Sequence, residues 1–217
     1  MGLPIQMPGK VIAIGLNYKD HAAEAGVPLP ERPVIFTKWN TSLIGPDETI
    51  IIHKGVTQID WEAELAVVIG KRASHVSEAD ALSYVAGLTC MNDVTDREAQ
   101  SKDGQWVRSK SYDTYGPIGP RLVPLSEIGD PHNLKIEARL NGKTVQSSNT
   151  SNLIFSIPYL ISYISARCTL EAGDVITTGT PHGVGAFLKP PVFMKDGDVI
   201  EIEIEKIGVL RNTVKAE

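Results

Sequence analysis

Short apolar runs separated by turn-forming residues recur along the whole chain, a pattern typical of a protein built mainly from β-strands. The clearest run covers residues 61–69, and Glu62 and Glu64 stand near its beginning. Side chains of a strand alternate between its two faces, so both carboxylates point to the same side. Neither face of the run looks solvent-exposed. Two buried like charges need a positive partner close by.

Similar patterns predict the other elements. Asn141-Gly142 between two alternating runs predicts a β-hairpin over residues 135–148. Capping and spacing signals predict a short helix that Gly26 ends, a helix over residues 77–87, and a helix beginning near Pro158. The further expected strands cover residues 10–15, 34–38, 49–53, 88–93, 174–178 and two runs between 196 and 214.

The order of these elements predicts one domain over residues 1–217, of the α+β class with β-structure dominant. Neither an internal repeat nor a shift in composition divides the chain. The segment "VPLPERP" cannot continue a helix because of its prolines. We therefore expect a mobile lid over about residues 17–33.

Composition and charge narrow the class of protein. The chain is 42% apolar and 22% charged, which is ordinary for a globular protein with one core. A net charge of −5 argues against a nucleic-acid partner, and the apolar runs are too short for a membrane span. Cys90 and Cys168 lie in apolar segments and are expected to be buried thiols. The expected location is cytoplasmic.

Glu62 and Glu64 gain a candidate third partner in Asp93, which ends a separate apolar run. Three carboxylates without Cys or His nearby in the sequence favour Mg²⁺ or Mn²⁺ over Zn²⁺. Three protein ligands leave coordination positions for water or a chelating substrate. The alternative is that the two glutamates line an exposed strand edge and pair with lysines. Asp60 precedes the run and is interpreted as a strand-entry residue.

His21 and Glu24 are three residues apart on a predicted helix, so they share a face and can hydrogen-bond. A histidine oriented by a carboxylate can hold a water molecule and accept its proton near neutral pH. The flanking prolines suit a lid that closes over a site. The alternative is an ordinary solvated helix face.

More polar residues follow Asp93. Asp93, Arg97 and Gln100 are spaced to project from neighbouring turns of one predicted helix, an arrangement suited to binding a carboxylate or an oxyanion. Lys110 lies in a strand-like segment and is either a charge stabiliser or a surface lysine.

The segment "TTGTPHGVG" is a glycine-rich loop after a strand. It lacks the spacing of a P-loop and of a dinucleotide-binding fold. Its glycines still allow backbone amides to approach a ligand, and Thr180 can hydrogen-bond a carboxylate. His182 is interpreted as a loop residue.

Five motifs together resemble one family. In chain order they are "GLNYKDHAAEAG", "DWEAELAVVIG", "YVAGLTCMNDVTDREAQ", "KSYDTYGPIGP" and "TTGTPHGVG", and they closely resemble the fumarylacetoacetate hydrolase superfamily over essentially the whole chain. Acylpyruvate-cleaving members have Arg where this chain has Leu16. The segments "GQW" and "AFLKPPVFMKDGD" look more like a branch of 2-hydroxyhepta-2,4-diene-1,7-dioate isomerases and diketo-acid hydrolases.

The resemblance implies a mixed β-sandwich roll, a homodimer, and a bound Mg²⁺ or Mn²⁺. The implied metal ligands are Glu62, Glu64 and Asp93. The implied catalytic residues are His21, Glu24, Lys110 and Gln100. The implied substrate-binding residues are Arg97, Thr180, Tyr18 and Gly179.

The resemblance also implies an enzyme that acts on small 2-oxo acids. The main expectation is a hydrolase that cleaves a C–C bond of a 2,4-dioxo acid, such as an acylpyruvate or a diketo sugar acid, and releases an enolate that the metal stabilises. The alternative is an isomerase or decarboxylase of the 2-hydroxyhepta-2,4-diene-1,7-dioate or oxaloacetate type. A third hypothesis is a catalytically silent metal-binding protein, against which the intact His21, Glu24 and Lys110 argue.

Overall fold

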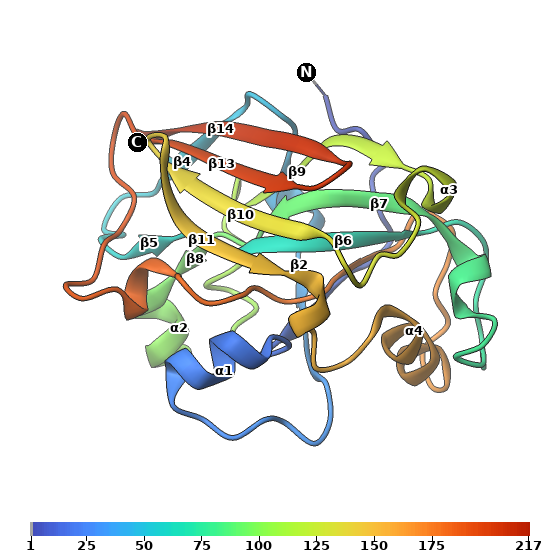
Figure 1. The fold of residues 1–217 in the computed structure, drawn as a ribbon. Helices are drawn as coiled ribbons and strands as arrows, with labels where there is room; N and C mark the ends of the chain where they lie inside the picture. The colour runs from blue at the N-terminus through green and yellow to red at the C-terminus, as the bar shows by residue number, and fades with distance from the viewer. Residues whose placement is uncertain (1) are drawn as a thin grey trace.

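Two β-sheets face one another in the computed structural model, which describes residues 2–217 (Figure 1). The larger sheet has seven strands in the order β2 (Val34–Lys38), β1 (Val11–Gly15), β12 (Val175–Thr177), β6 (Ala63–Ile69), β7 (Val85–Asn92), β9 (Gly116–Val123) and β3 (Leu43–Ile44). The smaller sheet has five, in the order β11 (Lys143–Asn149), β10 (Lys135–Leu140), β13 (Val199–Ile204), β14 (Gly208–Ala216) and β4 (Thr49–Ile52).

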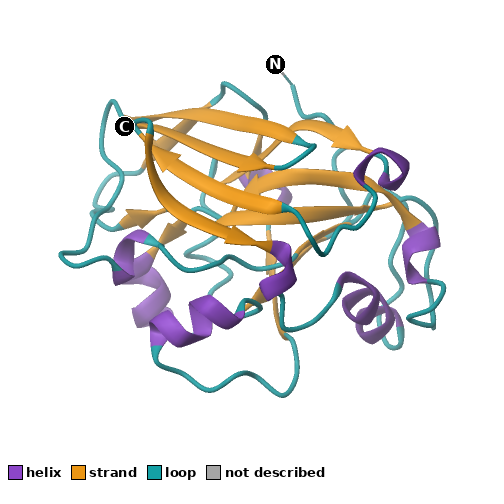
Figure 2. Cartoon of the chain, viewed as in Figure 1, coloured by secondary structure: helices purple, strands orange, loops and turns teal. Residues whose placement is uncertain are grey.

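Each sheet contains both parallel and antiparallel pairs, so the predicted mixed β-sandwich is confirmed. A separate two-stranded ribbon pairs β5 (Ile59–Asp60) with β8 (Thr95–Asp96). The helices are short and lie around the margins of the sheets (Figure 2). The α-helices are α1 (Lys19–Ala25), α2 (Arg97–Asp103), α3 (Leu125–Ile128) and α4 (Ile157–Ser165). The 3₁₀ helices are η1 (Asn40–Ser42), η2 (Ala81–Tyr84), η3 (Thr150–Asn152) and η4 (Gly185–Phe187).

Strand β6 lies inside the larger sheet, between β12 and β7, and is buried on both faces. Leu65 and Val67 belong to the core between the two sheets, together with residues of β10 and β13 such as Ile136 and Ile202. Val68 belongs to a second apolar cluster on the opposite face. The predicted alternation of β6 is therefore confirmed, and the alternative of an exposed edge is wrong.

Local sequence signals set the ends of several elements. Asn141 and Gly142 adopt φ values of 52° and 77° between β10 and β11, the left-handed pair that a tight hairpin needs. Helix α1 ends at Gly26, which has a φ of 67°. Helix α4 begins after Ser156, whose side chain accepts a hydrogen bond from the Tyr159 amide. The predicted hairpin and these two helices are confirmed.

The predictions of a helix over residues 77–87 and of a buried Cys168 are wrong. The segment 77–87 is not a helix: only η2 forms, and Val85 already pairs with Ile69 as the first residue of β7. Pairing with a buried strand outweighs the local helical preference there. Cys168 follows α4 and is exposed, whereas Cys90 in β7 is buried as expected.

Strand β2 forms one edge of the larger sheet, and Val34 and Ile35 on it are exposed. The homodimer stays a prediction. Within residues 2–217, the helices are all too short or too polar to cross a membrane.

The packing of β6 yields a stability prediction. Leu65→Ala should lower the free energy of unfolding by about 2–5 kcal/mol, because it leaves a cavity in the core between the sheets. Urea unfolding followed by circular dichroism measures the loss. Val209→Ala, at a half-exposed position of β14, is the control and should change stability by less than about 0.5 kcal/mol. Equal effects of the two substitutions would contradict the assignment of Leu65 to the core.

Candidate active site

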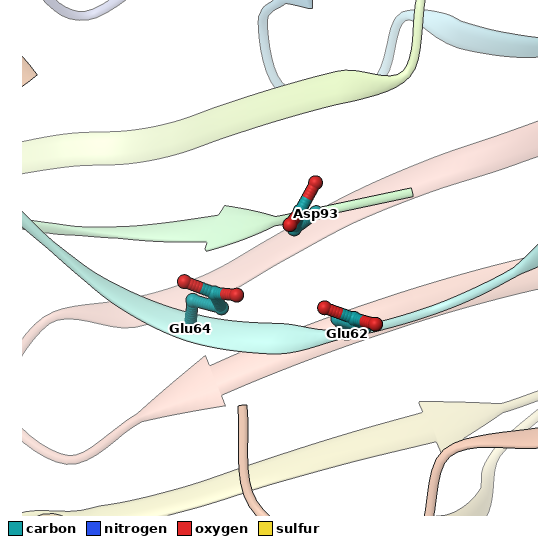
Figure 3. A group of neighbouring side chains, drawn as sticks. All are labelled: Glu62, Glu64 and Asp93. Atoms are coloured by element: carbon teal, nitrogen blue, oxygen red, sulfur yellow. The ribbon is translucent and has the colours of Figure 1, made fainter. Parts of the chain in front are cut away.

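Three carboxylates from two neighbouring strands converge at one end of the larger sheet (Figure 3). Glu62 directly precedes β6, Glu64 is the second residue of β6, and Asp93 directly follows β7. The two strands are antiparallel neighbours, and the Asp93 amide donates to the Glu62 carbonyl at 2.9 Å. One oxygen of each carboxylate lies within 4.8 Å of the others, and all three side chains are buried. The predicted convergence is confirmed.

Buried cations compensate two of these carboxylates through a chain of alternating charges. Arg97 bridges Asp60 and Glu62, Lys110 bridges Glu62 and Asp93, and Lys38 pairs with Asp93. In the order Asp60, Arg97, Glu62, Lys110, Asp93, Lys38, the successive N–O distances are 2.8, 2.7, 3.0, 2.9 and 2.6 Å. Three negative and three positive side chains therefore balance one another.

Glu64 is not part of this network of ion pairs. Among residues 2–217 no cationic side chain forms an ion pair with it. Its Oε2 atom accepts hydrogen bonds from the Thr177 hydroxyl and, at 2.7 Å, from the Gly179 amide. Burial, then the charges of Asp93 and Glu62, raise the pKa of Glu64 well above its ordinary value. Glu64 is thus a fully buried carboxylate that lacks a countercharge.

The pKa of Glu62 is shifted in the opposite direction. Burial acts to raise its pKa, but Lys110, Arg97 and His21 outweigh burial and lower the pKa to about 2. Two carboxylates two residues apart on one strand therefore differ because only one of them has cations beside it.

The site fits a hard divalent cation. Carboxylate oxygens are the ligands that Mg²⁺ and Mn²⁺ prefer. Ligand oxygens of an octahedral Mg²⁺ lie about 3 to 4.2 Å apart, which falls within the 4.8 Å that bounds this cluster. A cation beside Glu64 would supply the charge that this carboxylate lacks. Glu62, Glu64 and Asp93 would hold the ion, and each has an oxygen facing the others.

Lys110 is buried, which excludes the alternative of a surface lysine. It lies in a turn after α2 rather than in a strand, so the predicted element is wrong. Its ammonium donates to Glu62 Oε2, Asp93 Oδ2 and, at 2.8 Å, Thr95 Oγ1. Burial acts to lower the pKa of Lys110, but Asp93 and Glu62 outweigh it and raise the pKa. All three of its protons hold the site together in this arrangement.

Helix α2 positions Arg97 and Gln100. Its N-cap is Asp96, whose side chain accepts from the amides of Glu98 and Ala99. Asp93 therefore precedes the helix and the ribbon strand β8, and the prediction that it shares a helix with Arg97 is wrong.

Arg97 also donates to the Gln100 side-chain oxygen at 3.0 Å. Its Nη2 atom is buried and has no hydrogen-bond partner within residues 2–217. Arg97 Nη2 is thus an unused donor at the site, and a carboxylate or an oxyanion can accept a hydrogen bond from it.

The His21–Glu24 pair forms as predicted. His21 Nδ1 and Glu24 Oε2 are 3.1 Å apart, and Glu24 Oε1 accepts from the Gly183 amide at 2.9 Å. With its Nδ1 proton directed to Glu24, His21 keeps Nε2 as the proton-accepting atom. His21 is buried, which excludes the solvated helix face.

Helix α1 carries this pair and is tied to the body of the protein. Asp20 accepts hydrogen bonds from Ser148 at 2.5 Å and from Asn152 at 3.2 Å. His182, on the glycine-rich loop, lies 3.2 Å from Asp20. Mobility of a lid over residues 17–33 stays a prediction.

Thr180 lines the cavity, whereas Gly179 of the same glycine-rich loop and Tyr18 before α1 do not. Thr180 Oγ1 accepts from Gln146 at 2.9 Å, so its hydroxyl proton is available to a ligand. Gly179, with a φ of 95°, directs its amide to Glu64 instead. Tyr18 is fully buried and does not line the cavity.

These groups surround a cavity of about 320 Å³. Its polar wall is formed by His21, Glu62, Glu64, Arg97, Gln100, Ser101, Lys110 and Thr180. Asp93 is buried and is not one of the residues that line the cavity. The structure therefore brings most of the predicted site residues to one cavity, while the roles assigned to them stay predictions.

Several residues of the site escaped the sequence analysis. Lys38 is buried at the end of β2, and its burial lowers its pKa although Asp93 opposes the shift. Asp60 is more than a strand-entry residue, because it accepts from Arg97 and from the amides of Gly185 and Ala186. A lysine ending an apolar strand was the available signal for Lys38.

Comparison with known proteins agrees with this geometry. A family model described as "Fumarylacetoacetate (FAA) hydrolase C-terminal" matches residues 10–215. The rat (Rattus norvegicus) protein named "Oxaloacetate tautomerase Fahd2a, mitochondrial" is 49% identical over 212 residues, which cover 97% of this chain and 68% of the rat protein.

Solved structures of related proteins share the fold. The 5-carboxymethyl-2-hydroxymuconate delta-isomerase of Mycobacterium smegmatis is 42% identical with a TM-score of 0.88, covering 100% of this chain and 82% of that one. The 2-hydroxyhepta-2,4-diene-1,7-dioate isomerase of Mycobacterium marinum is 39% identical with a TM-score of 0.87, covering 100% and 77%. The rat relative is named as mitochondrial, so the cytoplasmic location stays a prediction.

The missing countercharge of Glu64 yields a prediction. In chelator, Glu64→Gln should be at least as stable as the wild type at pH 8, because the neutral amide avoids the cost of ionising a buried carboxyl group that has no countercharge. Saturating Mn²⁺ at 100 times Kd should stabilise the wild type by about 2.7 kcal/mol and the variant by much less. Denaturant unfolding with and without Mn²⁺ measures both effects.

The stability difference between the wild type and Glu64→Gln should depend on pH. Above pH 4.5 and up to its raised pKa, Glu64 binds its proton more tightly in the folded than in the unfolded chain. The stability of the metal-free wild type relative to Glu64→Gln should therefore fall as pH rises through this range. Glu78→Gln, at an exposed position, is the control and should show no such difference. A destabilised Glu64→Gln in chelator would contradict the charge assignment.

Proposed function

The chain belongs to the fumarylacetoacetate hydrolase family, and from this premise we propose that it is a divalent-metal-dependent enzyme that interconverts the keto and enol forms of a 2-oxo acid. The observation that carries the proposal is the buried, uncompensated Glu64 beside Glu62 and Asp93, in one cavity with His21. Similarity to proteins named oxaloacetate tautomerase and dienedioate isomerase favours this reaction over the hydrolysis that the sequence motifs first suggested.

Binding of the substrate uses the polar wall of the cavity. A divalent cation held by Glu62, Glu64 and Asp93 would act as a Lewis acid that stabilises negative charge on the substrate's keto oxygen. Arg97 Nη2 and the Thr180 hydroxyl are unused donors suited to the substrate carboxylate. Lys110 and Lys38 keep the acidic side chains in position.

His21 is the group that moves the proton on carbon. Keto–enol interconversion breaks the C–H bond next to the keto group and forms an O–H bond, or the reverse. Toward the enol, His21 Nε2 accepts the proton from carbon, the electron pair of the broken C–H bond moves to the keto oxygen, and the imidazolium then releases its proton to solvent. Toward the keto form, the imidazolium donates a proton to the carbon. Glu24 stabilises the imidazolium through its bond to Nδ1. The oxygen exchanges its proton with solvent.

C–C hydrolysis is the second candidate, and the His21–Glu24 pair is the observation that favours it. The same two side chains can hold a water molecule and accept its proton as it attacks a carbonyl. Isomerisation has less need of an activated water. Decarboxylation of oxaloacetate uses the same charge stabilisation and neither proton transfer to His21 nor water attack.

One set of assays separates these reactions. With Mn²⁺ present, the proposal predicts accelerated loss of enol absorbance from freshly dissolved oxaloacetate, with the oxaloacetate conserved. Carbon dioxide release would indicate a decarboxylase, and acid release from an acylpyruvate would indicate a hydrolase. Absence of all three activities in the metal-loaded protein would favour the catalytically silent hypothesis.

His21→Gln tests the proton transfer. The variant keeps a polar side chain but has no basic nitrogen, so tautomerisation should fall about 10²- to 10⁴-fold. Calorimetry should show that oxalate binding to the Mn²⁺-loaded protein changes less than about threefold. His75→Gln, at an exposed position, serves as control. Unchanged turnover in His21→Gln would remove His21 from the mechanism.

A further inference from the structure

We infer that the cavity selects 2-oxo acids that carry one carboxylate and an apolar tail, and that it discriminates against a second carboxylate on the tail. The inference rests on the proposed function and deepens it by naming the substrate class. It also separates this chain from relatives whose names specify dicarboxylates, namely oxaloacetate and 2-hydroxyhepta-2,4-diene-1,7-dioate.

The charge of the site is matched to one carboxylate. Ion pairs join six side chains from Asp60 to Lys38, three acidic and three basic, and Glu64 is a further carboxyl group outside these pairs. Counted formally, a divalent cation bound to an ionised Glu64 would leave one positive charge for a ligand. A 2-oxo acid with one carboxylate then completes neutrality, whereas a second carboxylate adds a buried charge without a partner.

The cavity offers no free cation for a second carboxylate. Among the described residues that line it, the lysine and arginine side chains are Lys110 and Arg97. Lys110 donates all three of its protons to protein atoms. Arg97 has one unused nitrogen, which the first carboxylate would occupy. A tail carboxylate would thus depend on a protonated His21, the group that must accept a proton in the reaction.

The rest of the cavity wall is apolar. Its larger side chains are those of Ile14, Leu16, Val27, Phe36, Trp106 and Phe187, and Gly15 and Ala25 complete it. Phe36 and Trp106 pack edge to face with ring centres 5.5 Å apart. Trp106 can occupy its place because residue 15 is glycine, since a Cβ there would lie 2.4 Å from the indole ring.

This apolar wall reaches both the catalytic group and the opening of the cavity. The Phe187 ring lies 5.8 Å from the His21 ring. Phe187 and Val27 are also among the exposed apolar residues of the molecule, so they border on solvent. A tail that extends from the reacting carbon therefore meets apolar side chains, and each buried methylene increases affinity about fourfold.

A matched pair of ligands tests the inference by binding rather than turnover. 4-Methyl-2-oxopentanoate and oxaloacetate share the 2-oxo acid head and the adjacent CH₂, and differ in an isopropyl group in place of the second carboxylate. Calorimetric titration of the Mn²⁺-loaded protein, or displacement of oxalate, gives both dissociation constants. The expected result is at least tenfold tighter binding of 4-methyl-2-oxopentanoate.

Val27→Arg supplies a cation at the apolar border and should shift this ratio at least tenfold toward oxaloacetate. Val209→Arg adds the same charge at a position of similar exposure on β14, away from the cavity, and should leave the ratio unchanged. Equal or tighter binding of oxaloacetate by the wild type would overturn the inference. So would equal ratios in the two arginine variants.

The outcomes for the inference and for the proposed function are separable. Preferential binding of 4-methyl-2-oxopentanoate without tautomerisation of either acid would support the inference and contradict the proposed function. Tautomerisation together with preferential binding of oxaloacetate would support the proposed function and contradict the inference. Binding of neither acid would contradict both.

Discussion

The buried carboxylate of Glu64 is the constraint around which the site is organised. A fully buried charge is costly unless an opposite charge accompanies it, and every other charge nearby already has its partner. Two hydrogen bonds from the end of β12 fix the Glu64 carboxylate in place without neutralising it. The fold thus places a carboxyl group without an ion pair at a point where two further carboxylates can share a cation.

The architecture explains how this arrangement is held. Antiparallel pairing of β6 with β7 brings Asp93 beside Glu62, and their other faces pack into the core between the sheets. Asp60 connects the ribbon, helix α2 and the loop near Gly185 through Arg97 and two backbone amides. Rigid elements therefore position the charged groups, while α1 adds His21 from one side.

Much of this was readable from the sequence, for physical reasons that differ by residue. The alternation of β6 predicted that Glu62 and Glu64 share a buried side, since a strand has a strict period of two. The three-residue spacing of His21 and Glu24 predicted their contact, because both lie on one short helix. Lys38 and the buried state of Lys110 depend on contacts 55 and 48 residues away in sequence, which no local pattern records. The helix predicted over residues 77–87 does not form, because the end of this segment pairs with β6 as the beginning of β7.

The central claim is that one divalent cation binds at Glu64, and Mn²⁺ binding tests it most directly. The loss of the free-ion signal in electron paramagnetic resonance counts bound Mn²⁺ per chain. The account predicts a single saturable site that Mg²⁺ competes for, that oxalate tightens, and that Glu64→Gln abolishes. Binding that does not saturate, or that survives intact in Glu64→Gln, would contradict it.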